Sequence, residues 1–349
     1  MHVRSIVLIS CVLTAVAAAP AADMTAEQAY SLVVQSPWIP KPPPKPEELA
    51  AARKALEAAA AKEPASARWT FAMGHLCTLE SRTLKKEEGE KKREQAVELF
   101  TKAAEREPKN ADYQYWVGDA NFDRVDDVGM LSQMSVASAG RKALEKAIVL
   151  DPNHVGAHYG LGQYYFQAPG IAGGSVEKAK KEGATLLAIP GGKGAYLGNM
   201  FLAEIAAKAE DWAEMSRRYI AAETCGGEGA DPASAMRSHL SLLLFRKKDP
   251  KAAQPVMDRY MKIASPDDMT AAFMDGEIKR QLGRCADALP RFQQVLAKNP
   301  GAQNSRWGAA VCHEAVGDKV AARSDYEEFL KRFPKDDRAK EAKEALKRL

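Results

Sequence analysis

Prolines recur in this chain at two fixed intervals. One set of three is spaced every 44 residues and the other every 34 residues, the members being Pro64, Pro108 and Pro152, then Pro266, Pro300 and Pro334. Because proline cannot continue an α-helix, each one marks the end of a helical segment. A period of about 20–50 residues indicates a repeat protein, in which successive units stack on one another.

The segments before these prolines share an apolar pattern. Side chains that are small, large and then medium follow one another at spacings of four and three residues, which places them on one face of a helix. The members are Ala52, Leu56 and Ala59; Ala96, Phe100 and Ala103; Gly140, Leu144 and Ala147; Ala288, Phe292 and Val295; and Ala322, Tyr326 and Phe329. A glycine recurs in another helix of the unit, at Gly74, Gly118, Gly162 and Gly276. It lets a neighbouring helix approach closely, at a cost of about 1 kcal/mol in helix propensity.

A small–large–small second helix closed by a proline resembles the tetratricopeptide repeat. The resemblance is strong over 94–168 and 269–336. It is weak over 194–265, where helix pairs are still expected at 194–208 with 211–224 and at 232–247 with 250–264. The family implies an all-α fold that forms a right-handed superhelical α-solenoid, and this sequence predicts about seven helix pairs preceded by a partial one. It also implies a role in binding proteins.

The expected organisation has four parts. They are a signal peptide at 1–22, an N-terminal segment with a Pro-rich linker at 23–48, the solenoid at 49–336 and a polar capping helix at 337–349. Glycine-rich loops at 190–192 and 225–232 predict joints near 192 and 228. These joints are interpreted as flexure within one stack, with a true domain boundary as the alternative.

Residues 1–22 are typical of an export signal. The apolar run from Ser5 to Ala17 is too short to span a bilayer, and the small residues after it allow cleavage after Ala18 or, preferably, Ala21. An uncleaved helix or anchor is one alternative, and lipidation at Cys11, which ends the lipobox-like "LISC", is another. We expect an exported protein of bacterial type, periplasmic in a Gram-negative source, with no membrane insertion after cleavage.

About ten residues are inserted between the paired helices of the first two units, and fewer in the third. The inserted segments are 82–94, 123–138 and 168–175. They fall at one point of the unit, so we expect them on one edge of the solenoid, where insertions often form a binding face. The alternative is that they only lengthen helices. The second carries Met130, Leu131 and Met134, and Met-rich surfaces are adaptable partner sites. The third, "APGIAGGS", is similar to a segment of exported bacterial tetratricopeptide proteins.

Aromatic residues stand three places before the recurring glycine position, and two more follow seven residues later. They are Phe71, Tyr115, Tyr159, Phe273 and Trp307, followed by Phe122 and Phe166. In the family such positions line the concave groove, while packing between first helices is the alternative. Tyr115, Tyr159 and Gln163 are the first candidates for partner contact, with Asp119 as an acceptor. Some tetratricopeptide domains bind the terminal carboxylate of a partner with Lys, Asn and Arg at these groove positions. This chain has aromatic residues there, so binding of a terminal carboxylate is not expected.

Other classes of function lack a sequence signal. The net charge of +4 without clustered basic residues argues against nucleic-acid binding. His154 and His158 share a helical spacing but lack further zinc ligands. "PGGKG" at 190–194 is not a phosphate loop, and no G-x-S-x-G occurs. We therefore expect no enzyme activity, cofactor or metal. If two cysteines form a disulfide, Cys285 and Cys312, which lie 27 residues apart in adjacent units, are the first candidates, and buried free thiols are the alternative.

The sequence thus predicts a scaffold or adaptor of the cell envelope that binds a protein or peptide through the groove or the insertions. An accessory binding subunit of a transporter, secretion system or enzyme complex is the alternative. An enzyme with an unrecognised site is a remote third possibility.

Overall fold

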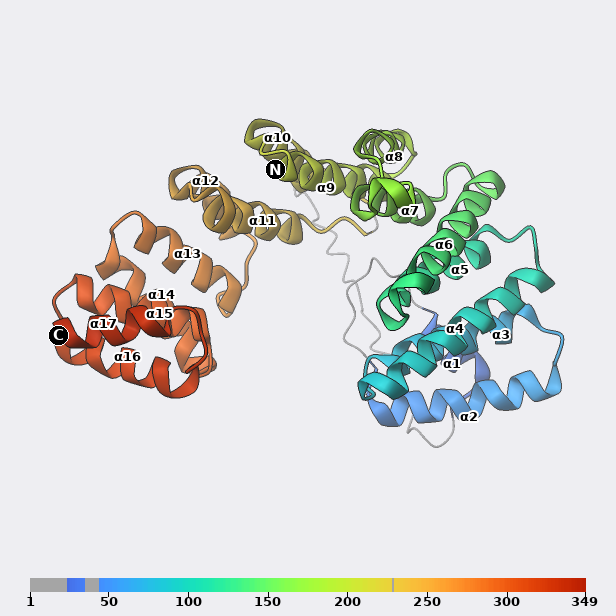
Figure 1. Cartoon of the computed structure of the whole chain (residues 1–349), viewed down its shortest axis with the longest axis horizontal. Coiled ribbons are helices and arrows are strands. Elements are labelled where there is room, and N and C mark those ends of the chain that lie inside the picture. The colour runs from blue at the N-terminus through green and yellow to red at the C-terminus, as the bar shows by residue number, and fades with distance from the viewer. Residues whose placement is uncertain (1–23, 35–43, 228) are drawn as a thin grey trace, which may run out of the picture. The chain divides into compact units, whose positions relative to one another are not determined.

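The computed structural model describes residues 24–34, 44–227 and 229–349, and all regular structure in these residues is helical (Figure 1). The all-α prediction is therefore confirmed. The predicted signal peptide, Cys11 and residues 36–43 of the Pro-rich linker lie outside the described residues. The chain divides into two compact units, Met1–Leu161 and Gly162–Leu349, and each is described by itself. The joints expected near 192 and 228 both fall in the second unit and stay predictions.

The first unit is a series of antiparallel helices in chain order. They are α1 (Ala26–Val33), α2 (Pro46–Lys62), α3 (Ala67–Ser81), α4 (Lys86–Arg106), α5 (Ala111–Asp123), the short 3₁₀ turn η2 (Val125–Asp127), α6 (Met130–Leu150) and the first half of α7 (Val155–Gln167). Each helix packs mainly on its sequence neighbours, most extensively α3 on α4 and α5 on α6. Helices that are neighbours in the sequence are therefore also neighbours in space, as expected of a helical repeat.

The two recurring glycines of this unit, Gly74 and Gly118, face the large residues of the second helices. A Cβ on Gly74 would lie 2.7 Å from the ring of Phe100, and one on Gly118 would lie 2.5 Å from Leu144. Phe100 and Leu144 are fully buried. Each glycine thus leaves the space that the large side chain of its partner helix fills, and the predicted close approach is confirmed.

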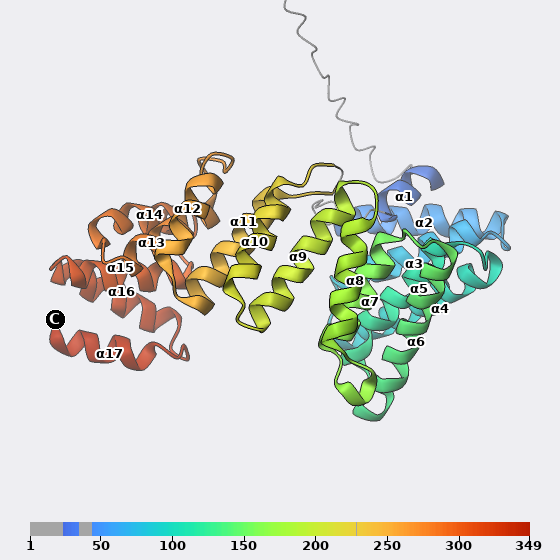
Figure 2. The same cartoon turned by 90° about the horizontal axis from the view of Figure 1, so that it is seen from above.

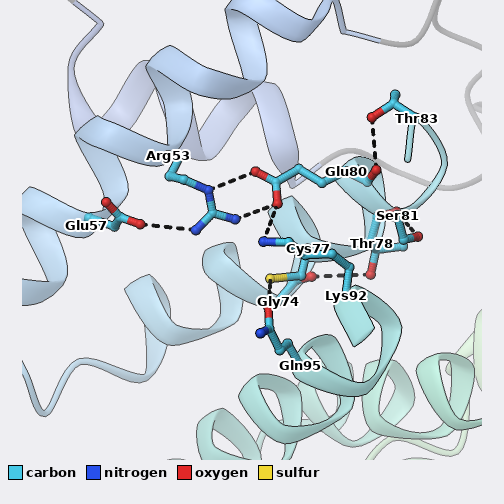
Figure 3. A network of polar contacts seen from close by, with 10 residues as sticks. All are labelled: Arg53, Glu57, Gly74, Cys77, Thr78, Glu80, Ser81, Thr83, Lys92 and Gln95. Atoms are coloured by element: carbon cyan, nitrogen blue, oxygen red, sulfur yellow. Dashed lines mark hydrogen bonds and ion pairs between the residues drawn. The ribbon is translucent and has the colours of Figure 1, made fainter. Parts of the chain in front are cut away.

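A polar network joins α2, α3 and α4 beside this core (Figure 3). The Nε of Arg53 donates to Glu80 Oε1 at 2.9 Å, and Lys92 Nζ lies 2.9 Å from Glu80 Oε2. Burial alone would raise the pKa of Glu80, but these two cations hold it below its ordinary value. The carboxylate is therefore compensated from both neighbouring helices, which is what a partly buried charge requires.

His75 is buried in an aromatic environment in the same unit. Its ring lies 4.2 Å from that of Trp116, 4.6 Å from Phe71 and 5.1 Å from Phe100, measured between centroids. Within the described part of the chain its Nε2 has no hydrogen-bond partner. Burial lowers the pKa of His75 to about 3, so the folded protein holds a neutral imidazole.

The second unit continues the alternation from the second half of α7. It contains η3 (Gly170–Ala172), α8 (Val176–Ala188), α9 (Gly192–Lys208), α10 (Trp212–Thr224), α11 (Pro232–Ser241), the π-helical turn η4 (Leu242–Lys247), α12 (Pro250–Tyr260), α13 (Met269–Gln281), α14 (Cys285–Lys298), α15 (Gln303–Ala315), α16 (Lys319–Arg332) and α17 (Ala339–Arg348). The pairs expected in the weak region are confirmed, and Figure 2 shows α9 beside α10. Helices α3 to α16 are consistent with seven pairs among the described residues.

The last helix, α17, lies inside the segment expected to cap the stack. Ala339, Ala342 and Ala345 are its buried residues, and the last two pack in the cluster of Trp307 and Phe329. The opposite face is polar, and the capping role expected of this segment stays a prediction.

Buried acidic residues in this unit are paired with basic side chains. Arg259 donates two hydrogen bonds to Glu223, at 2.9 and 3.1 Å, and so links α12 to α10. Asp275 contacts Lys279 and Arg291, and Asp325 contacts Arg306 and His313. These pairs fix the register between neighbouring helices, because breaking one would leave a charge in the core.

The two glycine-rich loops of this unit contact each other. A Cβ on Gly192, at the start of α9, would fall 1.3 Å from the carbonyl oxygen of Gly226, which follows α10. Backbone atoms cannot yield as a flexible side chain can. Glycine at this position is therefore required by the close approach of the loops.

We expect Gly192→Ala to destabilise the protein, although alanine normally stabilises a helix by about 1 kcal/mol relative to glycine. The added methyl group cannot fit without moving one loop, so the melting temperature should fall by several degrees. Gly170→Ala is the matched control, because a Cβ there meets nothing within 4 Å. Equal melting temperatures for the two variants, measured by circular dichroism, would contradict the packing.

The buried His75 predicts a loss of stability in mild acid. The unfolded chain binds a proton below a pH of about 6.5, whereas the native ring does not until about pH 3. The free energy of unfolding should therefore decrease as the pH is lowered through this range. At pH 5 the histidine accounts for a loss of about 2 kcal/mol relative to pH 7. Urea titrations at pH 7 and pH 5 should show this difference for the natural chain and a smaller one for His75→Leu. The same pH dependence in both would show that other groups cause it.

Candidate partner-binding surfaces

Several aromatic residues expected in the groove are buried in the core. Phe71 and Tyr115 of the first unit are 3% and 5% exposed. The ring of Phe71 lies 4.5 Å from Tyr113 and 5.4 Å from Phe100. These contacts correspond to packing within the stack, the alternative that the sequence left open.

The corresponding residues of the second unit have similar surroundings. Phe166 and Trp307 are each 8% exposed, and their rings lie 5.9 Å from Phe201 and 5.3 Å from Phe329. Phe273 is half-buried and stacks at 6.1 Å on Phe245 of η4. Phe273 is therefore the most accessible of these three.

Three other candidates lie closer to the surface. Tyr159, Gln163 and Phe122 are half-buried. Gln163 donates from Nε2 to Glu204 at 3.2 Å and accepts from Gln167 at 2.8 Å. A partner that used the Gln163 amide would have to replace these bonds.

Tyr115 and Asp119 form a pair on one face of α5. The Tyr115 hydroxyl donates to Asp119 Oδ1 at 3.4 Å, and the Tyr115 ring lies 5.0 Å from His154. Desolvation, and then the nearby charge of Asp123, raise the pKa of Asp119 to about 7. The pKa of Asp123 is also raised by desolvation, which Arg82 and Arg93 oppose. This face of α5 therefore carries carboxyl groups whose charge is incompletely compensated.

The first and third inserted segments take different forms. Most of the first is absorbed into α4, which begins at Lys86 and runs for 21 residues. The third forms η3 and its flanking turns, and the Tyr164 hydroxyl donates to the carbonyl of Ala172 within it. Helix lengthening thus accounts for much of the first segment and does not account for the third.

The second inserted segment exposes an apolar patch at the start of α6. Met130, Leu131 and Met134 are 84%, 96% and 52% exposed, and we call these three side chains the α6 patch. Positions 130, 131 and 134 lie on one helical face at spacings of one and three residues. Large apolar side chains grouped in this way on a surface are typical of an interaction site.

Two ion pairs hold the turn that precedes the α6 patch. Arg93 of α4 donates from Nε and a terminal nitrogen to the two carboxylate oxygens of Asp127, at 2.5 and 2.6 Å. Arg124 donates to Glu94 at 2.5 Å. Sequence reasoning did not identify these residues. The sequence offered one indication of these pairs. The first two inserted segments stand at equivalent points of adjacent repeats and carry opposite charges.

The two histidines that share a helical spacing have structural roles. His154 Nδ1 accepts from the backbone amide of Ala157 at 3.0 Å, and His158 Nε2 lies 3.0 Å from the carbonyl oxygen of Pro152. Among the described residues no group of three His, Cys, Asp or Glu side chains could hold a metal ion. In the same part of the chain no helix is both long and apolar enough to cross a membrane.

The family model for the tetratricopeptide repeat matches residues 90–128 and 273–337, that is, α4 with α5 and most of α13 to α16. The helical-repeat class is thus supported in both units by the sequence itself. The curated proteins gave no match.

Three solved structures are similar in fold. A tetratricopeptide repeat protein from Parabacteroides merdae is 15% identical, with 76% of this chain and 92% of that one aligned and a TM-score of 0.47. Yeast Tom70 is 13% identical over 81% and 56%, with a TM-score of 0.47. YrrB, described as a TPR protein with an unusual peptide-binding site, is 19% identical over 71% and 99%, with a TM-score of 0.36.

We expect Asp127→Asn to loosen the start of α6, because it removes the charge that holds Arg93. Hydrogen exchange of the backbone amides around 130–134 should accelerate roughly tenfold. Glu177→Gln is the control, because the Lys180–Glu177 pair is exposed and distant in sequence from the turn. No difference between the two variants would mean that the turn is held by backbone contacts alone.

Proposed function

We propose that the protein is a non-enzymatic interaction scaffold or adaptor of the cell envelope. The tetratricopeptide match supports the general role, because stacked helical repeats offer extended surfaces for protein binding. The export signal expected at 1–22 supports the location. The observation that carries the proposal is the α6 patch.

The patch combines exposure with a fixed position. Its three side chains extend into solvent, while Arg93–Asp127 and Arg124–Glu94 tie the preceding turn to α4. A surface that is already ordered loses less conformational entropy on binding. An apolar surface of this kind favours a protein or peptide that presents apolar side chains, since flexible methionine side chains adapt to the shape of a partner.

The face of α5 offers a second surface, favoured by the raised pKa of Asp119. A cationic side chain placed beside Asp119 and Asp123 would stabilise their ionised forms. An accessory subunit that holds one extended basic peptide would use this face. Asp119→Asn tests it better than truncation of Tyr115, because Tyr115 is a core residue.

The test is affinity capture from an envelope extract, followed by titration of the captured partner. The variant Met130→Ser/Leu131→Ser/Met134→Ser should weaken binding on the order of 100-fold, because three apolar contacts are lost. Val149→Ser is the matched control, being 80% exposed on the same helix, and should bind normally.

The remaining outcomes separate the alternatives. A partner kept by the triple variant and lost by Asp119→Asn would move the site to α5. Equal binding by all variants would contradict both surfaces. N-terminal sequencing of the envelope protein tests export separately, with a start at Ala22 or Ala19 expected.

A further inference from the structure

Two thiols meet in the core of the second unit. Cys285 is the first residue of α14, Cys312 lies on α15, and their Sγ atoms are 2.7 Å apart. Ordinary non-bonded heavy atoms stay at about 3.5–4.0 Å, and a disulfide bond measures about 2.05 Å. The sulfur atoms are therefore closer than simple packing requires and need only a small adjustment to bond.

The surroundings of the pair are apolar and closed. Cys285 is 7% exposed and Cys312 is fully buried, in a cluster with Ala288, Phe292 and Ala309. The other described cysteines have different neighbours. Cys77 of the first unit lies 4.0 Å from the Gln95 side chain, and Cys225 donates to the carbonyl of Ala221 at 3.3 Å.

We propose that Cys285 and Cys312 are joined by a disulfide in the native protein. The inference rests on the proposed export, because thiols stay reduced in the cytosol and pair in oxidising compartments. The oxidant is an external disulfide of the thiol–disulfide exchange class. One cysteine thiolate attacks it and displaces one donor thiol; the second cysteine then displaces the other. Two protein thiols lose two protons and two electrons, and the donor disulfide becomes two thiols.

Burial determines when this exchange takes place. Desolvation raises the pKa of the Cys312 thiol, the neighbouring Cys285 acts in the same direction, and Arg280 opposes them. Little thiolate is present once α14 and α15 have closed, and a donor cannot enter the core. The bond therefore forms while the chain is folding, and the finished core protects it from reductants.

The bond would fasten one repeat to the next. Cys285 belongs to the pair α13–α14 and Cys312 to the pair α15–α16. In a stack of repeats, stability is the sum of each unit and its interfaces, so terminal units open first. A covalent link at this interface would make the C-terminal repeat and α17 unfold together with the preceding repeat.

The experiment counts thiols in protein trapped by acid inside cells and alkylated under denaturing conditions. Reduction should reveal two additional thiols, and a non-reduced peptide map should contain a linked Cys285–Cys312 peptide. Cys77→Ser/Cys225→Ser should keep this increase of two, and Cys285→Ser/Cys312→Ser should abolish it. Reduction should lower the melting temperature by about 5–10 °C in the natural chain and in the first variant only.

The result also separates this inference from export. Envelope protein that has lost its leader and gains no thiols on reduction would overturn the disulfide while leaving export intact. A retained leader together with free thiols would overturn both. Because the natural chain is measured directly, the outcome does not depend on whether a cysteine variant folds.

Discussion

The contact between a glycine of one helix and a large side chain of the next sets how closely the two helices pack in three of the pairs. Gly74 receives Phe100, Gly118 receives Leu144 and Gly276 receives Phe292, and a Cβ on any of these glycines would lie 3.0 Å or less from its partner. Each glycine costs about 1 kcal/mol in helix propensity, and full burial of a large apolar side chain contributes about 1.5–3 kcal/mol. Close packing therefore outweighs the cost in each pair.

This packing also decides which side chains are left for a partner. Helices that approach so closely draw the neighbouring aromatic residues into the core, and Phe71, Tyr115 and Trp307 are buried as a result. Accessible apolar surface remains where a second helix extends beyond its partner. The α6 patch lies at such an extension, and the ion pairs from α4 give it a defined position.

Buried charged residues also connect neighbouring helices. Glu80, Glu223 and Asp275 are each held by cations from neighbouring helices, so charged residues reinforce the order that the apolar core sets. Asp119 and Asp123 depart from this rule, as their raised pKa values indicate. Incomplete compensation is compatible with a stable unit because a carboxyl group with a raised pKa takes up a proton more readily and is then uncharged.

The sequence by itself determined the all-α class, the helix pairs and the faces that pack, because the proline period and the small–large–medium spacing are local patterns. It also brought Cys285 and Cys312 forward as a pair, since the two lie in adjacent repeats. Sequence reasoning listed Phe71, Tyr115 and Met130 as partner candidates and placed Tyr115 among the first, although Tyr115 is buried and Met130 is exposed. Exposure depends on which neighbouring helix covers a side chain, and that is a property of the packed structure. The same holds for Arg93 with Asp127 and for Gly192 with Gly226, whose members are 34 residues apart in each case and meet only when successive helices close on one another.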